Sequence, residues 1–131
     1  MNRWKKSRSA TYNIAYHLIW CTKYRRKVLV SAVEDRLRVL LVEKAKDMNV
    51  VIETMETMPD HVHLFAKCEP TDNPQYLVKN FKGYTSRFLR QEFPFLKSKL
   101  PCLWTRSYYC ESIGSISEES VKKYIEQQKN K

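Results

Sequence analysis

The chain has 131 residues, of which 43% are hydrophobic, and 24 Lys and Arg against 14 Asp and Glu give it a net charge of +10. This length predicts one domain, residues 1–131, with enough apolar side chains for a real core. No apolar run could span a bilayer and there is no signal-peptide pattern, so we expect a cytosolic protein without a membrane partner. A small domain this basic usually meets a polyanion.

The side-chain types narrow the choice of polyanion. Eight Tyr, three Trp and five Phe accompany the cations. Aromatic rings among Lys and Arg suit single-stranded nucleic acid, whose bases are free to stack, although many of these rings must also fill the core. The cysteines are scattered without a C-x-x-C pair, which argues against a structural zinc site and indicates reduced, buried thiols. They are Cys21, Cys68, Cys102 and Cys110.

The first part of the chain predicts a basic arm and a strand. Residues 1–10 are polar and basic and indicate a loose arm that either touches phosphates or is disordered. Residues 12–20 alternate as a strand, so successive side chains point to opposite faces. The cluster Lys23-Tyr24-Arg25-Arg26-Lys27 follows, and it is either a phosphate contact or a solvated loop.

Two helices are expected from apolar residues at helical spacing. The first opens with a capping box, Ser31 and Glu34, and Asn49 can end it in the left-handed conformation. The second opens where Asn73 can cap it and Pro74 occupies its first turn. We assign the first helix to packing alone.

The last third predicts a strand and one more helix. Residues 103–113 are expected to form a long final strand, and Ser117 can cap the helix that follows. Gly83, inside the second helix, costs about 1 kcal/mol relative to Ala, and a close backbone approach is one reason that would account for it.

Between the two helices lies a hairpin that carries the main motif. Residues 50–58 and 61–68 are β-rich runs around the turn Pro59-Asp60. In the second strand Val62 and its alternate neighbours face a core, so His61 and His63 share the other face about 7 Å apart. Two imidazoles at that spacing either converge on a cation or belong to a polar solvent face, and a metal site needs further ligands.

The order of elements is that of an α+β, ferredoxin-like or RRM-like fold. A βαββαβ unit builds an antiparallel sheet with two helices on one face. The histidine pair would lie on the free face, which the last helix can cover. On that helix Tyr124 offers a nucleophilic hydroxyl and Gln128, one turn on, a carbonyl oxygen for a hard cation; alternatively, Tyr124 packs with its hydroxyl in water and Gln128 is exposed.

Three stretches together resemble the HUH single-tyrosine transposases of small bacterial and archaeal insertion sequences, the TnpA type. They are the motif His61-Val62-His63, the early strand 16–29 with its basic end, and the helix Tyr124-Ile125-Glu126-Gln127-Gln128. The resemblance covers nearly the whole chain, so residues 1–131 would be one HUH catalytic domain that includes the C-terminal tyrosine helix. His-x-His alone is a weak signal, whereas the three stretches together are specific.

The resemblance implies a role for each matched position. Tyr124 would attack a DNA phosphodiester to give a 5′-phosphotyrosine, and His61, His63 and Gln128 would bind Mg²⁺ or Mn²⁺. Relatives act on single-stranded DNA with hairpin ends and form homodimers through the final strand. Because the substrate is prokaryotic DNA, the resemblance also implies a cytoplasmic protein that associates with the nucleoid when it acts. From charge and placement alone we expect phosphate contacts at five positions, which are Lys23, Arg25, Arg26, Lys82 and Arg87.

Two other hypotheses remain at this stage. A ferredoxin-like sheet can bind single-stranded RNA or DNA without catalysis, although the aromatic-rich strand motif usual in such modules is absent. A domesticated relative would use the same chemistry on chromosomal repeats, and only its substrate would differ.

Overall fold

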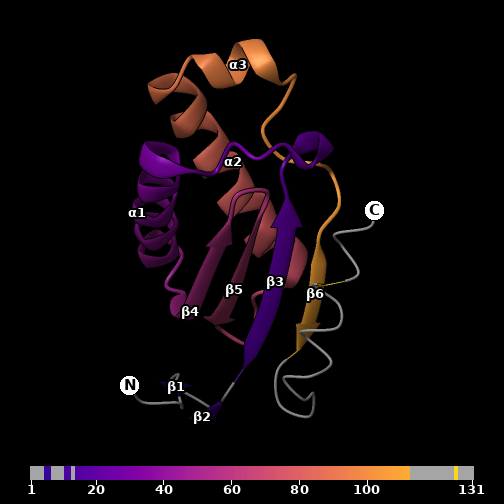
Figure 1. Cartoon of the computed structure of the whole chain (residues 1–131). Coiled ribbons are helices and arrows are strands. Elements are labelled where there is room, and N and C mark those ends of the chain that lie inside the picture. The colour runs from indigo at the N-terminus through magenta and orange to yellow at the C-terminus, as the bar shows by residue number, and fades with distance from the viewer. Residues whose placement is uncertain (1–4, 7–10, 13, 113–125, 127–131) are drawn as a thin grey trace.

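One antiparallel sheet and two long helices behind it make up most of the described chain (Figure 1). The computed structural model describes residues 5–6, 11–12, 14–112 and 126. The elements in chain order are β1 (Lys5–Lys6), β2 (Thr11–Tyr12), β3 (Ala15–Cys21), the 3-10 turn η1 (Lys23–Arg25), α1 (Ser31–Asp47), β4 (Val51–Met58), β5 (His61–Lys67), α2 (Pro74–Glu92), α3 (Phe95–Lys99) and β6 (Tyr109–Ser112).

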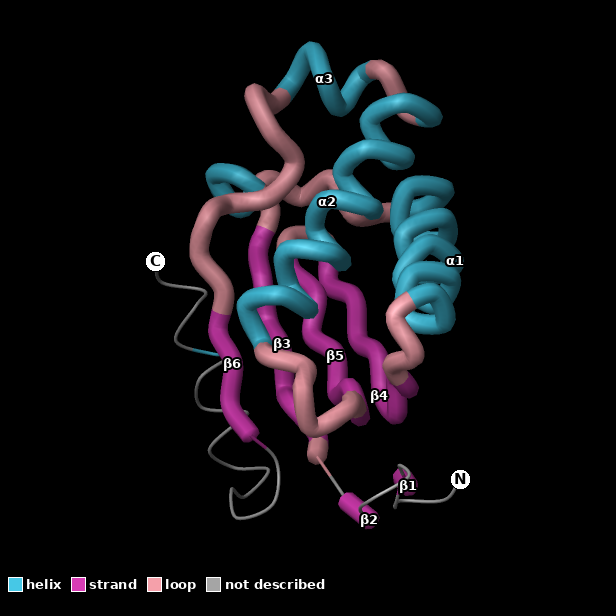
Figure 2. The backbone as a smooth tube through the Cα atoms, turned by 180° about the vertical axis from the view of Figure 1, so that it is seen from behind, coloured by secondary structure: helices cyan, strands magenta, loops and turns pink. Residues whose placement is uncertain are grey.

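The sheet has the strand order β4-β5-β3-β6, and every neighbouring pair is antiparallel. In chain order α1 follows β3 and α2 follows β5. This is the ferredoxin-like βαββαβ arrangement, as the sequence predicted. Figure 2 shows both helices on the same face of the sheet. No helix within the described ranges covers the opposite face, and none is long and apolar enough to cross a membrane.

The core lies between the sheet and the two helices. Leu18, Val62 and Leu64 point into it from the strands and have no exposed surface. Trp20 stacks on Phe81 of α2 with ring centroids 6.1 Å apart. This packing fixes the alternation along β3 and β5, so the odd-numbered residues of both strands lie on the other face.

The helix ends follow the sequence with one exception. Asn49 has a φ of 56° directly after α1, and Asn73 accepts a hydrogen bond from the backbone of Tyr76 at 2.8 Å, as expected. The capping box was wrong: Val30 is the N-cap, no side chain caps the helix, and Ser31 has a φ of 52°. Glu34 instead accepts a hydrogen bond from Thr57 Oγ1 at 2.7 Å, which ties α1 to β4.

The first strand is shorter than predicted and the arm contains structure. Lys5–Lys6 pairs with Thr11–Tyr12 as a separate two-stranded sheet, and β3 begins only at Ala15. Gly83 also differs from expectation, because a Cβ built there would meet nothing within 4 Å. The close backbone approach that its position suggested is therefore not found.

The final strand was predicted too long. Within the described residues the continuous ladder with β3 covers Tyr109–Ser112, and the segment before it meets the sheet only locally, through a bridge of Trp104 with Thr22 and a hydrogen bond from Thr105 N–H to the carbonyl of Cys21 at 3.0 Å. The ammonium of Lys82 donates to the carbonyls of Thr105, Arg106 and Ser107 at 2.6, 3.3 and 2.9 Å. Those carbonyls turn toward a side chain on α2, so they are not available to a β-ladder.

Candidate active site

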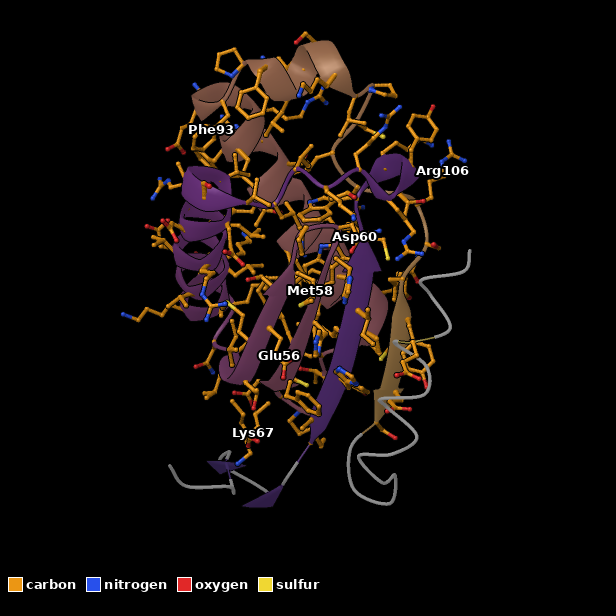
Figure 3. The ribbon with its side chains drawn as sticks, viewed as in Figure 1. Glu56, Met58, Asp60, Lys67, Phe93 and Arg106 are labelled. Atoms are coloured by element: carbon orange, nitrogen blue, oxygen red, sulfur yellow. The ribbon has the colours of Figure 1, made fainter. Side chains whose placement is uncertain are left out.

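The hairpin of β4 and β5 brings the histidine pair together as the sequence predicted. His61 and His63 are 7% and 5% exposed, and their ring centroids are 6.1 Å apart. The residue between them, Val62, is fully buried on the core side. Figure 3 shows Asp60 at the tip of this hairpin and Glu56 further along β4, so carboxylates flank the pair.

His61 has one nitrogen anchored and one bare. Its Nδ1 lies 2.8 Å from Asp60 Oδ1, and Arg25 donates to the other oxygen of Asp60 at 3.1 Å. Its Nε2 is buried and has no hydrogen-bond partner among the residues that the structure describes. When the neutral ring donates Nδ1–H to the carboxylate, Nε2 presents a lone pair, which is the arrangement found in metal-ligating histidines.

The charges around Asp60 keep it ionised. Burial raises the pKa of this carboxyl, but the hydrogen bond and charge of His61, together with Arg25, outweigh burial and lower the pKa below its ordinary value. Asp60 therefore remains an acceptor for His61 at neutral pH.

His63 has partners at both nitrogens. Glu56 Oε2 lies 2.9 Å from Nε2, and His17 Nε2 lies 3.3 Å from Nδ1. Burial lowers the pKa of His63 despite the nearby Glu56 charge, so the ring is neutral at pH 7 and able to bind a metal. Because the Glu56 side chain is 59% exposed, it can turn away and free Nε2.

His17 is the site residue that sequence reasoning missed. It is fully buried, stacks on Phe65 at 4.1 Å between centroids, and has Nδ1 3.8 Å from Glu111 of β6. Burial, followed by the charge of His63, lowers the pKa of His17 to about 4. The available signal was the alternation of residues 12–20, which separates His17 from Leu18 and Trp20, but its neighbour across the ladder was not predicted.

The donors present fit a divalent ion that accepts nitrogen and oxygen ligands. His61 and His63 supply two imidazoles, which are ligands for first-row transition-metal ions, whereas Mg²⁺ prefers oxygen. Within the described residues no three His, Cys, Asp or Glu side chains converge on a metal position. Further ligands would therefore have to be other groups or water.

The tyrosine half of the predicted site lies outside the described residues. Neither Tyr124 nor Gln128 is described, while Glu126 between them is helical. Both assignments, and the C-terminal catalytic helix that carries them, therefore stay predictions.

The five predicted phosphate contacts fall into two groups. Lys23, Arg25 and Arg26 lie in or next to η1, at the His61 end of the sheet. Lys82 and Arg87 lie on α2, behind the sheet. The Lys82 ammonium is held by three carbonyls, an arrangement that favours a structural role, and its pKa is lowered chiefly by burial. Contact with DNA stays a prediction for all five.

Sequence comparison places the chain in a family. The model of the family described as "Transposase IS200 like" matches residues 10–128. The transposase TnpA of ISDra2 from Deinococcus radiodurans is 40% identical over 129 residues, covering 97% of this chain and 92% of the relative. The transposase of insertion sequence IS200 from Salmonella typhimurium is 27% identical over 119 residues, covering 89% of this chain and 78% of the relative.

Solved structures agree with the fold. A Deinococcus radiodurans R1 protein assigned as a transposase superposes with a TM-score of 0.83 at 37% identity, over 95% of this chain and 97% of that one. A REP-associated tyrosine transposase bound to a REP hairpin gives 0.59 at 13% identity, over 92% and 67%, which supports the fold alone.

The ferredoxin-like fold, together with the relatives that share it, places this chain among the transposases. With the family match over residues 10–128, the chain belongs to the IS200-like transposase family.

Proposed function

We propose that this transposase cleaves and rejoins single-stranded DNA at the ends of an insertion sequence. Tyr124 is the nucleophile, and His61, His63 and Gln128 hold Mg²⁺ or Mn²⁺. The observation that carries the proposal is the bare, buried Nε2 of His61, since Asp60 anchors the opposite nitrogen of the ring. A buried polar atom without a partner is costly unless a ligand completes it.

The chemistry balances without ATP. The Tyr124 hydroxyl loses its proton and attacks phosphorus, so a tyrosine O–P bond forms while the bond from phosphorus to the 3′ oxygen breaks. The 3′ oxygen takes up a proton as a free hydroxyl, and the 5′ phosphate stays on the enzyme. A second 3′-hydroxyl later attacks this phosphotyrosine and returns the hydroxyl of Tyr124, so phosphodiester energy is conserved.

The histidine side of the site serves this reaction by positioning. Asp60 holds the His61 ring in one orientation and Arg25 holds Asp60, at 2.8 and 3.1 Å. On the other side His17 supports the His63 ring at 3.3 Å. A bound divalent ion supplies stabilisation of the charge that develops on a non-bridging phosphate oxygen.

We further propose that two copies associate through β6. This strand is the last in the order β4-β5-β3-β6 of the described sheet, and an edge strand is a template for another strand. This association would let the tyrosine helix of one copy complete the active site that contains the histidines of the other. Sedimentation equilibrium should find a dimer; a monomer that cleaves at full rate would contradict this assembly.

A denaturing gel tests the function. Full-length protein is mixed with end-labelled single-stranded DNA that contains a hairpin and its flank, in Mn²⁺, Mg²⁺ or EDTA. We expect a metal-dependent band at the mass of protein plus DNA, absent in Tyr124→Phe, while this variant still binds the DNA. A band from Tyr124→Phe would refute the nucleophile.

The same gel separates the alternatives. Strong binding that ignores EDTA, with no covalent band from any substrate, would favour a non-catalytic binding module. Cleavage of a chromosomal repeat hairpin in preference to an insertion-sequence end would indicate a domesticated enzyme.

A further inference from the structure

We propose that Tyr24 is a stacking platform for one unpaired base of the substrate strand, next to the His61 end of the active site. The inference rests on the proposed function, because it names how the single strand is held beside the histidines. The phosphate contacts expected in the cluster around Tyr24 use its lysine and arginine side chains and give the ring itself no role.

The ring of Tyr24 is presented to solvent by an unusual backbone. Tyr24 is 66% exposed, more than the other large hydrophobic residues that the structure places at the surface. Tyr24 and Arg25 have φ values of 57° and 52°, in the left-handed region that a bulky side chain rarely adopts. Backbone of this kind persists only where the surroundings hold it, and it clusters at ligand-binding sites.

Hydrogen bonds on both sides of η1 restrain the backbone of Tyr24 and Arg25 in this conformation. Thr22 Oγ1 donates to the carbonyl of Arg26 at 2.7 Å, and the backbone N–H of Lys23 donates to the carbonyl of Leu103 at 2.8 Å. The N–H of Thr22 reaches the carbonyl of Asp60 at 3.0 Å. The turn is thus tied to the hairpin that carries the histidines.

Two adjoining hollows connect Tyr24 with His61. One, of about 510 Å³, includes Lys27, Asp60 and His61 in its lining, and the other, of about 490 Å³, includes Lys23 and Tyr24. Arg25 lines both, so the two hollows lie on either side of one residue, and in our proposal the strand runs past it. Figure 3 shows the segment around Arg106 beside η1, and this segment supplies the far wall. That wall is fixed by the Lys82 contacts.

The chemistry of this path suits a single strand. Cations along a groove follow the backbone phosphates, and an exposed ring takes a base regardless of its identity. The Lys23 ammonium lies over one face of the Tyr24 ring, 5.0 Å from its centroid, so a base would stack on the opposite face. Duplex DNA keeps its base faces covered and gains nothing from the ring.

The first test compares three variants in binding by fluorescence anisotropy to a labelled single-stranded hairpin-flank oligonucleotide. Tyr24→Asn removes the ring and retains a residue that tolerates positive φ, so the turn is kept. We expect it to weaken binding about 5- to 100-fold, as loss of one stacked base does, while Tyr24→Phe stays within about twofold. Tyr76→Asn is the matched control, since Tyr76 is 51% exposed on α2.

The second test removes the base instead of the ring. Single abasic sites are moved along the oligonucleotide. At one position the loss should equal that of Tyr24→Asn, and the two losses should not add. Equal binding by wild type and Tyr24→Asn, or additive losses at every position, would overturn the inference.

These outcomes are distinct from a failure of the proposed function. A covalent band from wild type with unchanged binding by Tyr24→Asn would remove the platform and leave the transposase chemistry. If the abasic scan locates the platform but no covalent band forms, the stacking role of Tyr24 stands and the proposed transposase chemistry fails.

Discussion

The two faces of the sheet are built from alternate residues of the same strands, yet they are satisfied in different ways. On the face covered by α1 and α2, residues such as Leu18 and Trp20 fill space between layers. On the other face His17, His61 and His63 are equally buried but are held by hydrogen bonds and carboxylates. Packing stabilises the first face, while on the second face polar side chains hold one another and leave His61 Nε2 without a hydrogen-bond partner among the described residues.

This difference separates stability from activity. A covered-face residue contributes through the apolar area it buries, so its loss should lower the free energy of unfolding. A histidine on the other face is kept for a ligand, and its loss should spare the fold. Variants from each face can therefore test whether the covered face determines stability and the histidine face determines activity.

The largest effect is expected from His61→Ala. We expect no metal-dependent cleavage, because the ring that presents the bare Nε2 is gone. The free energy of unfolding in urea should change little. Cleavage at wild-type rate, measured on end-labelled single-stranded DNA, would remove His61 from the site.

Trp20→Ala probes the covered face. Trp20 is 1% exposed and contacts both Phe81 and Trp104, so its loss should cost about 3–5 kcal/mol of unfolding free energy. Urea denaturation followed by circular dichroism measures this. Under conditions where the variant is folded, metal binding should be retained; a selective loss of metal binding with full stability would reverse the assignment of the two faces.

Asp60→Asn sharpens the comparison within the histidine face. Loss of the carboxylate behind His61 should weaken Mn²⁺ binding about 10- to 100-fold, the usual effect of removing a residue that orients a ligand. Titration followed by the signal of free Mn²⁺ gives the affinity. Asp47→Asn is the control, because that carboxylate pairs only with Lys44 among the described contacts and is 70% exposed. Equal affinities for both variants would show that Asp60 does not orient His61.

Local sequence signals predicted much of the fold. The turn Pro59-Asp60, the cap at Asn73 and the alternation along β5 each act over a few residues, and each was confirmed. From them followed the hairpin, the helix layer and the face on which His61 and His63 lie.

The parts that were missed depend on contacts between distant residues. His17 and His63 are 46 positions apart, so the contact exists only once β3 and β5 are in register. β6 is short where Lys82 of α2 binds the carbonyls near Arg106. The capping box fails where Glu34 accepts a hydrogen bond from Thr57 of β4 and not from the start of its own helix. Sequence patterns report propensity, whereas these positions are decided by tertiary partners.

The central claim is that the buried nitrogen of His61 is kept for a divalent ion shared with His63. Pulsed electron paramagnetic resonance of Mn²⁺ bound to the Tyr124→Phe variant with uncut single-stranded DNA tests this most directly, because it counts nitrogens coordinated to the ion. We predict coupling to two imidazole nitrogens, and to one after His61→Ala is added. Mn²⁺ that binds with no coupled nitrogen, or with the same coupling in both proteins, would contradict the account.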